Sequence, residues 1–201
     1  MLEHLGEYPE AERLRRHILE SRLRVLGEEH ELALQAMNNL GLLLWKDGRA
    51  KEAEPLLQRA VQVHRRIFDD EYLVAMGNLA LALSTQGKLA EAEPLYRALL
   101  KSARTRQDDV YLAQTLGNLA WHYLDMGKPA EAEPMFREAL DLRRRVHGET
   151  HPQIVFATDS LAIALQRMGQ FDEGEQLLRQ TLETVRDQLG NEHPTTLLYE
   201  S

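Results

Sequence analysis

Residues 48–60 read GRAKEAEPLLQRA, and this stretch decides the fold because closely related stretches return along the chain. Residues 87–97 (GKLAEAEPLYR) and 127–137 (GKPAEAEPMFR) are near copies, while residues 6–16 (GEYPEAERLRR) and 169–179 (GQFDEGEQLLR) keep the glycine, the acidic residues and the arginine. The glycines at positions 6, 48, 87, 127 and 169 are spaced by 42, 39, 40 and 42 residues. A period of this size is typical of an array of structural repeats.

Each repeat is predicted to be two antiparallel helices that meet at the glycine. Glycine suits the left-handed backbone at the end of a first helix, and Glu52 and Glu54 then lie near the positive end of the second helix dipole. Pro55 should shift or bend the first turn of that second helix, and Pro94 and Pro134 should do the same. Apolar residues recur at helical spacing around Gly48, at Met37, Leu40, Gly41, Leu44, Ala53, Leu56, Leu57, Ala60 and Val61.

The predicted fold class is all-α, an α-solenoid whose repeats form a single array over residues 1–201. We place a partial repeat at 1–30, complete repeats at 31–70, 71–109, 110–151 and 152–193, and the start of a truncated repeat at 194–201. Arrays need polar caps at their ends, and residues 1–5 and 194–201 resemble incomplete first helices. We therefore expect the chain to be a segment of a longer protein, or its ends to be covered.

The composition favours a cytoplasmic protein and argues against general binding to nucleic acid or membranes. The net charge is −8, and 28% of the residues are charged, with both signs present. The chain has no cysteine, so thiolate metal sites, disulfides and cysteine nucleophiles are excluded. No apolar run approaches the ~20 residues of a membrane-spanning helix, and the residues after Met1 do not form a signal peptide.

The second helices carry acidic and basic residues four positions apart, with the acid first. Such pairs stabilise an exposed helix by about 0.3 kcal/mol each, so we interpret them as a salt-bridged outer surface. An anion-binding stripe of arginines is the alternative. The pairs are Glu12 with Arg16, Glu93 with Arg97, Glu133 with Arg137 and Glu175 with Arg179.

The correlated positions resemble the tetratricopeptide repeat (TPR) family, in particular its long-period branch similar to kinesin light chain. The resemblance rests on the segments 38–41 (NNLG), 77–80 (GNLA) and 117–120 (GNLA), on the joint glycines with their EAEP words, and on Gly-x-x-His-Pro turns. It covers essentially the whole chain. It implies a right-handed superhelix whose first helices line a concave groove for peptides or partner segments.

One side of each first helix mixes amide and apolar residues, which is typical of a binding surface. These positions lie 13, 9, 6 and 2 residues before the joint glycine, so they share one face of the helix. Asparagine side chains can pair with the backbone of an extended peptide. Alternatively, Asn39, Asn78 and Asn118 make structural hydrogen bonds between adjacent repeats. The predicted groove residues are Gln35, Asn38, Asn39, Leu42, Asn78, Leu81, Gln114, Asn118, Trp121, Ser160 and Ile163.

No motif indicates catalysis, a cofactor or a metal site, so we predict that the chain is not an enzyme. His30, His151 and His193 recur at turns, where helix capping is the simpler role, and His122 lies between two aromatic residues as a packed side chain would. The sequence contains no phosphate-binding glycine loop, nucleophile elbow or zinc-protease motif.

The leading hypothesis is a non-enzymatic interaction scaffold that binds a peptide or partner protein segment in its groove. One alternative is a regulatory or sensor segment of a larger signalling protein, such as a bacterial protein kinase or a nucleotide-binding receptor. Another is a structural array that self-associates end to end. A TPR resemblance by itself does not choose among them, because such repeats serve many unrelated functions.

Overall fold

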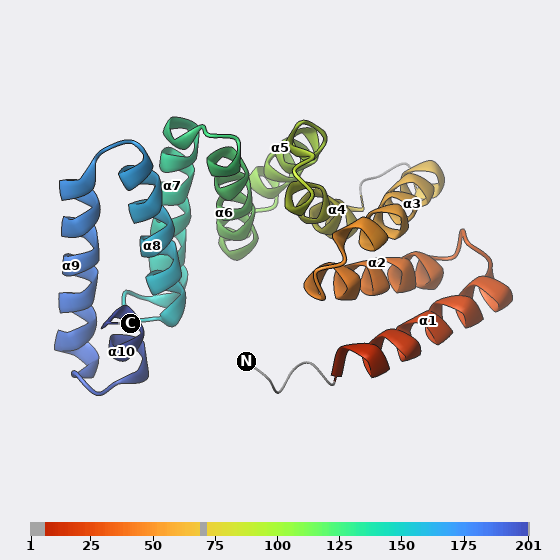
Figure 1. The fold of residues 1–201 in the computed structure, drawn as a ribbon, viewed down its shortest axis with the longest axis horizontal. Helices are drawn as coiled ribbons and strands as arrows, with labels where there is room; N and C mark the ends of the chain where they lie inside the picture. The colour runs from red at the N-terminus through yellow and green to blue at the C-terminus, as the bar shows by residue number, and fades with distance from the viewer. Residues whose placement is uncertain (1–6, 69–71, 201) are drawn as a thin grey trace. The chain divides into compact units, whose positions relative to one another are not determined.

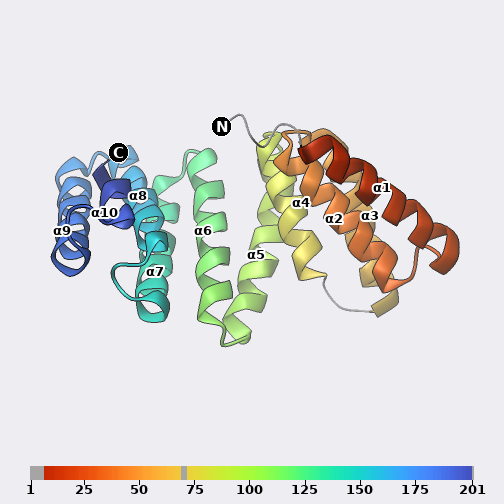
Figure 2. The ribbon, with the colours of Figure 1, turned by 90° about the horizontal axis from the view of Figure 1, so that it is seen from below.

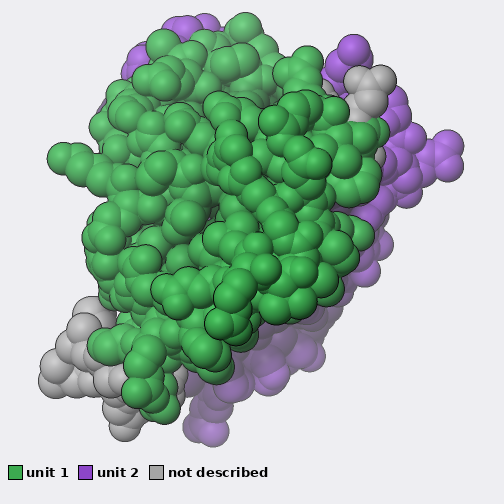
Figure 3. Space-filling model, turned by 90° about the vertical axis from the view of Figure 1, so that its right-hand side faces the viewer, with its two compact units in different colours: residues 1–99 green, residues 100–201 purple. Residues whose placement is uncertain are grey.

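The computed structural model describes residues 7–68 and 72–200, and within these ranges the chain forms ten α-helices and no β-strand (Figure 1). The chain has two compact units, residues 1–99 and 100–201, which Figure 3 colours separately, and the boundary lies within α5. The predicted incomplete helix at residues 1–5 and part of the predicted turn at 68–70 lie outside the described residues. The helices are α1 (Glu7–Leu26), α2 (Glu31–Lys46), α3 (Ala50–Phe68), α4 (Leu73–Thr85), α5 (Leu89–Thr105), α6 (Asp109–Asp125), α7 (Pro129–His147), α8 (Pro152–Arg167), α9 (Phe171–Leu189) and α10 (Pro194–Glu200).

Helices pack against their neighbours in the chain, as an α-solenoid requires. In unit 1, α2 contacts α1, α3 and α4, and in unit 2, α8 contacts α7, α9 and α10. Figure 2 shows α7, α8 and α9 in succession within unit 2. The expected all-α array of helix pairs is therefore confirmed.

Each pair is joined at its glycine by the tight turn that the sequence predicts. Three residues separate the helices, and Gly48, Gly87, Gly127 and Gly169 have φ angles of 78°, 75°, 70° and 78°. The amide that follows each glycine donates back to the carbonyl five residues earlier, as in Arg49 N to Leu44 O at 2.8 Å and Lys88 N to Leu83 O at 3.0 Å. These bonds satisfy carbonyls that the helix end would otherwise leave free.

Within each unit, the core lies between the helices that pack against one another. The predicted core leucines Leu40, Leu79, Leu119 and Leu161 are all buried, at 1%, 6%, 1% and 1% exposure. In unit 2, Leu100 of α5 packs against a cluster shared by α6 and α7. That cluster consists of Ala113, Leu116, Ala139 and Leu142.

The prolines do not interrupt the second helices, and residues with positive φ form turns between repeats. Pro55, Pro94 and Pro134 lie exposed inside helices that run unbroken through them. Between repeats, Gly148 and Gly190 end α7 and α9 with positive φ angles of 80° and 86°. Gln107, after α5, also takes a positive φ of 54°, although it is not a glycine.

Candidate functional site

The predicted ligand-binding residues lie along one side of the first helices, which we call the first-helix surface. In unit 1 it consists of Gln35, Asn39, Leu42, Val74, Asn78 and Leu81. In unit 2 it consists of Gln114, Asn118, Trp121, Phe156, Ser160 and Ile163. All of these side chains are exposed or half-buried, so each unit presents amide and apolar groups together at its surface.

Asn38, which was predicted to belong to the same surface, is instead only 4% exposed. Its Oδ1 accepts a hydrogen bond of 2.8 Å from Nδ2 of Asn78, one repeat further on. Its own Nδ2 donates to Oδ1 of Asn39 at 3.5 Å. Asn38 and Asn78 therefore link α2 to α4, which is the structural role that the alternative interpretation gives to the asparagines.

Asn118 has the same repeat position as Asn78 but a different environment. One repeat earlier, the position of Asn38 is taken by Gly77, which carries no amide to pair with. The side chain of Asn118 is half-buried and makes no hydrogen bond to any described residue. Because an amide has both donors and an acceptor, Asn118 can offer these groups to a peptide backbone.

Trp121 is the large aromatic residue of the first-helix surface and is 38% exposed. Its ring packs edge to face against the ring of buried Phe136. The ring centroids are 5.6 Å apart, and the angle between the ring planes is 77°. Such aromatic pairs stabilise their geometry by about 0.5–1.5 kcal/mol. Trp121 is therefore held in place by α7 while part of its indole remains available for contact.

A hollow of about 380 Å³ lies within unit 2 between α6, α7 and α8. Gln114 and Phe156 of the first-helix surface line it, and Phe156 is 61% exposed. The other lining residues are Asp109, Val110, Ala113, Arg143, Val146, His147 and Gln153.

Arg143 is a charged lining residue that was not among the predicted groove residues. It projects from α7 beside Gly117 of α6, where a β-carbon added to the glycine would lie 3.5 Å from Nη2. Burial lowers the pKa of its guanidinium below the ordinary arginine value. The repeat register gave no clear signal, since the equivalent position holds Arg22 in α1 and His64 in α3 as well as the buried apolar residues Ala103 and Val185 in α5 and α9.

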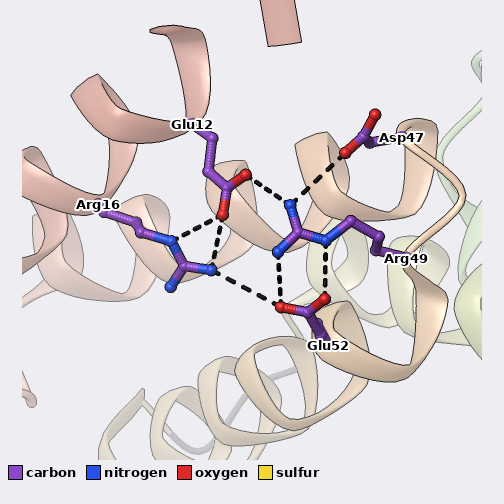
Figure 4. A network of polar contacts seen from close by, with 5 residues as sticks. All are labelled: Glu12, Arg16, Asp47, Arg49 and Glu52. Carbon is purple, nitrogen blue, oxygen red and sulfur yellow. Dashed lines mark hydrogen bonds and ion pairs between the residues drawn. The ribbon is translucent and has the colours of Figure 1, made fainter. Parts of the chain in front are cut away.

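A network of ion pairs surrounds the joint at Gly48 in unit 1 (Figure 4). Arg49 follows Gly48 and contacts Glu12 of α1 at 2.5 Å and Glu52 of α3 at 2.7 Å. Arg16 joins the same two carboxylates at 2.7 and 3.8 Å, and Asp47 lies 3.5 Å from Arg49. Hydrogen bonds from Arg49 and then Arg16 lower the pKa of Glu12, and the hydrogen bond from Arg49 lowers that of Glu52.

The same arrangement returns at the second joint. Lys88 follows Gly87 and contacts both carboxylate oxygens of Glu54, at 2.7 and 2.8 Å. Gln86 also donates to Glu54 at 2.7 Å, and these partners, Lys88 first, lower the pKa of the carboxyl group. At these two joints of unit 1, the cation after the glycine therefore connects its helix pair to the second helix of the preceding pair.

The predicted salt bridges within the second helices are all formed. Arg16 pairs with Glu12, Arg97 with Glu93, and Arg179 with Glu175, at 2.7, 2.8 and 2.6 Å. The fourth pair, Arg137 with Glu133, is also present, and Arg137 reaches Glu173 of α9 as well. This bears out the interpretation of the arginines as part of a salt-bridged surface.

The histidines have the predicted structural roles. Nδ1 of His30, His151 and His193 each accepts a hydrogen bond of 3.2 Å from the amide two residues later, which caps α2, α8 and α10. His122 is 1% exposed within α6. The described part of the chain has no cluster of three His, Cys, Asp or Glu side chains that could hold a metal ion.

A family comparison and a search of solved structures give the same fold. The model of the tetratricopeptide repeat matches residues 1–66, 34–105 and 111–187. No curated protein sequence matches the chain. Among the helices of residues 7–68 and 72–200, none is long and apolar enough to cross a membrane.

Three solved structures illustrate the likeness. Kinesin light chain TPR-like repeats of Podosopora anserina share 22% identity at a TM-score of 0.80, covering 91% of this chain and 88% of that one. BtubC (BKLC) of P. vanneervenii shares 22% identity at 0.79, covering 94% and 77%. A Rap protein, solved in complex with Competence and Sporulation Factor, shares 14% identity at 0.72, covering 98% of this chain and 51% of its own.

Proposed function

Because this chain belongs to the tetratricopeptide repeat family, we propose that it is a non-enzymatic scaffold that binds a peptide or partner protein segment on its first-helix surface. The observation that carries the proposal is the exposure of Trp121 beside Asn118, whose amide has no partner among the described residues. A rigid aromatic residue and an unpaired amide together suit a peptide, which presents side chains and backbone groups at once.

The neighbouring structures support a scaffold of this kind. The Rap protein has this fold and was solved in complex with Competence and Sporulation Factor, so a solenoid of similar helix pairs accommodates a second molecule. Apolar residues of the first-helix surface add contact area in this chain, since Val74 and Phe156 are 62% and 61% exposed. Isolated exposed apolar residues are ordinary, but within each unit these residues share a helix face with amides, which fits an extended ligand.

The test is a random-peptide display screen against the purified chain, followed by affinity and stability measurements on variants. Asn118→Ala should weaken binding of the selected peptides by about 1–2 kcal/mol and leave the melting temperature unchanged, because no buried partner loses its bond. Trp121→Ala should weaken binding more, as truncation of a central aromatic residue does. Arg179→Ala, on the charged side of α9, is the control and should change neither quantity.

Asn78→Ala separates binding from structure, because its amide has a buried partner. Removing it leaves Oδ1 of Asn38 without its donor, which should cost about 1–3 kcal/mol of unfolding free energy. The proposal fails if the screen yields no binding peptide, or if the selected peptides bind Asn118→Ala and Trp121→Ala as tightly as the unmodified chain.

A further inference from the structure

α1 is a second helix that has no first helix of its own among the described residues. It packs against α2, which is the first helix of the following pair. Ile18 stands twelve residues after Gly6 and is 36% exposed. The same position after the joint glycine holds Ala60, Leu99 and Ala139, which are 0%, 5% and 0% exposed. α1 therefore lacks the helix that covers this position in complete pairs.

α10 is the converse, a first helix that no second helix follows in the described part of the chain. It packs against α8 and α9, and His193 caps it as His151 caps α8. Leu197, four residues after the capping histidine, is 51% exposed. Val155 and Leu34, four residues after the capping histidines of α8 and α2, are 2% and 0% exposed. The position of Leu197 is therefore one that a complete pair buries.

The positions of these two exposed residues pack together in a complete pair. Ala113 and Val155 each stand 14 residues before a joint glycine, so Ala113 in α6 has the position of Leu197. Ala139 in α7 has the position of Ile18. Ala113 and Ala139 belong to one buried cluster. The helix pair that α10 begins and the helix pair that α1 completes are thus the two halves of the same structure.

The charges of the two ends favour contact between unlike ends. α9, beside α10, carries five acidic residues and two arginines, whereas α1 carries four glutamates and five arginines. The hollow between α8 and α9 is lined by Asp159 and Glu175, with no lysine or arginine among its described lining residues. Arg13 of α1 is 84% exposed at the side chain, and its carboxylate neighbour Glu10 lies 4.0 Å away. Two acidic ends repel each other, while an acidic end attracts the arginines of α1.

We propose that copies of this chain associate head to tail, with α10 of one copy and α1 of the next forming a composite helix pair. Ile18 and Leu197 meet at its centre, as Ala139 and Ala113 do in the pair of α6 and α7. The helices of a pair are antiparallel, so the N-terminal half of α1, with 20 residues against seven in α10, extends toward the acidic hollow. Such an interface joins unlike surfaces, so association continues to longer assemblies or closes into a ring.

The first experiment measures mass by light scattering coupled to size-exclusion chromatography over a series of concentrations. The mass of the unmodified chain should rise with concentration. Ile18→Glu and Leu197→Glu should each weaken association at least about tenfold, because a charge replaces an apolar side chain that the interface buries. Val74→Glu, at a residue of α4 that is 62% exposed, is the control and should associate as the unmodified chain does.

Folding and peptide binding can be followed separately from association. Ile18 and Leu197 are exposed in a single copy, so both variants should keep the helical circular dichroism of the unmodified chain. Neither residue belongs to the first-helix surface, so peptides from the display screen should bind both variants unchanged.

The second experiment mixes the two variants in equal amounts. Ile18→Glu keeps an intact α10 end, and Leu197→Glu keeps an intact α1 end, so one composite pair can form between the two proteins. The mixture should therefore give a species with the mass of two chains, although neither variant does so alone at the same concentration. No further copy can add, because both remaining ends carry the glutamate.

Three results would overturn the inference. The first is a chain that stays monomeric at every concentration. The second is association that either variant retains at the strength of the unmodified chain, which would show that one end meets its own kind or that another surface is used. The third is a mixture that gives no species beyond those of the separate variants, or one that gives masses above two chains.

Discussion

Thr158 is a buried residue whose hydroxyl oxygen has no hydrogen-bond partner among the described residues. The same repeat position holds Met37, Met76 and Leu116, which are buried apolar residues. An unsatisfied buried hydroxyl costs about 1–3 kcal/mol relative to an apolar group of the same shape. Thr158→Val should therefore raise the unfolding free energy by about 1 kcal/mol in urea denaturation.

Thr181 provides the matched control. It is also buried, at 2% exposure, but its hydroxyl donates to the carbonyl of Leu177 at 2.9 Å. Thr181→Val removes this existing hydrogen bond, so it should not raise the unfolding free energy. Equal gains in both variants would show that β-branched apolar packing, and not the unsatisfied hydroxyl, controls stability at these sites.

Single residues also show which parts of the site the sequence could reveal. The salt bridges four residues apart and the capping histidines were predictable because each depends on local spacing along the helix. The pairing of Asn38 with Asn78 was not, because it depends on how closely α2 and α4 approach. The place of Arg143 beside Gly117 was not predictable either, because it depends on how α6 and α7 pack.

At the scale of an element, the turn between α5 and α6 differs from the turns at Gly27, Gly148 and Gly190, where the residue with positive φ is a glycine. Gln107 has a φ of 54°, a left-handed conformation that costs a residue with a side chain about 1 kcal/mol. Gln107→Gly should relieve this strain and stabilise the chain by about 0.5–1 kcal/mol, measured by thermal unfolding. The reverse change at another turn, Gly148→Gln, should destabilise it, since Gly148 has a φ of 80°. A loss of stability in Gln107→Gly would contradict this account of the turn.

The joints between helix pairs should make stability depend on acid pH. Hydrogen bonds from arginine or lysine lower the pKa of Glu12 and Glu54 in the folded chain. A lowered folded-state pKa means that the stabilisation is complete above the ordinary glutamate pKa of about 4.3 and is lost as the pH falls through the folded-state value. Urea denaturation should therefore show the unfolding free energy decreasing below about pH 4.3.

Variants of the same carboxyl groups test this pH dependence. The double variant Glu12→Gln with Glu54→Gln should be less stable at neutral pH and should lose less stability on acidification than the unmodified chain. Glu175→Gln, whose partner Arg179 is 74% exposed at the side chain, is the control with little expected effect. A pH profile that the double variant does not flatten would place the acid sensitivity elsewhere.

At the scale of the whole molecule, the last complete helix pair carries an apolar surface that the earlier pair in unit 2 has covered. A hollow of about 450 Å³ lies between α8 and α9, and Phe171 beside it is 62% exposed. In the preceding pair, the positions of Gln166 and Leu178 hold Leu124 and Phe136, which are 1% exposed where α8 packs. In the preceding pair, the next first helix, α8, covers the equivalent positions.

A capping helix with an apolar inner face and a polar outer face, fused after α10, should raise the melting temperature and suppress self-association. The reason is that Phe171 and Leu197, 62% and 51% exposed, would gain a partner. Light scattering coupled to size-exclusion chromatography measures the association, and a fused helix with a polar inner face is the control. Identical behaviour of all three proteins would show that this surface does not drive association.

The repeat made the fold more predictable than the site. Five occurrences of one pattern fix the helix pairs and their joints, because each joint needs the same glycine, acid and apolar spacing. The division of the chain within α5 has no counterpart in the pattern, which continues through Leu99 and Leu100. Ligand contacts depend on what differs between repeats, such as Asn38 at a position where the next two repeats have Gly77 and Gly117. A repeat signal averages such differences away.

The ion pairs at the joints affect how the number of repeats in the chain can change. Arg49 meets Glu12 as Lys88 meets Glu54, so either cation can complete either joint. Deleting residues 48–86, one period of 39 residues, would bring Lys88 to Glu12 and Asn118 to Asn38, and both contacts could form again. Unequal recombination between such copies would therefore keep the ion pair at the joint and the amide pair between first helices, so the gene could lengthen or shorten its array by whole repeats with these contacts intact.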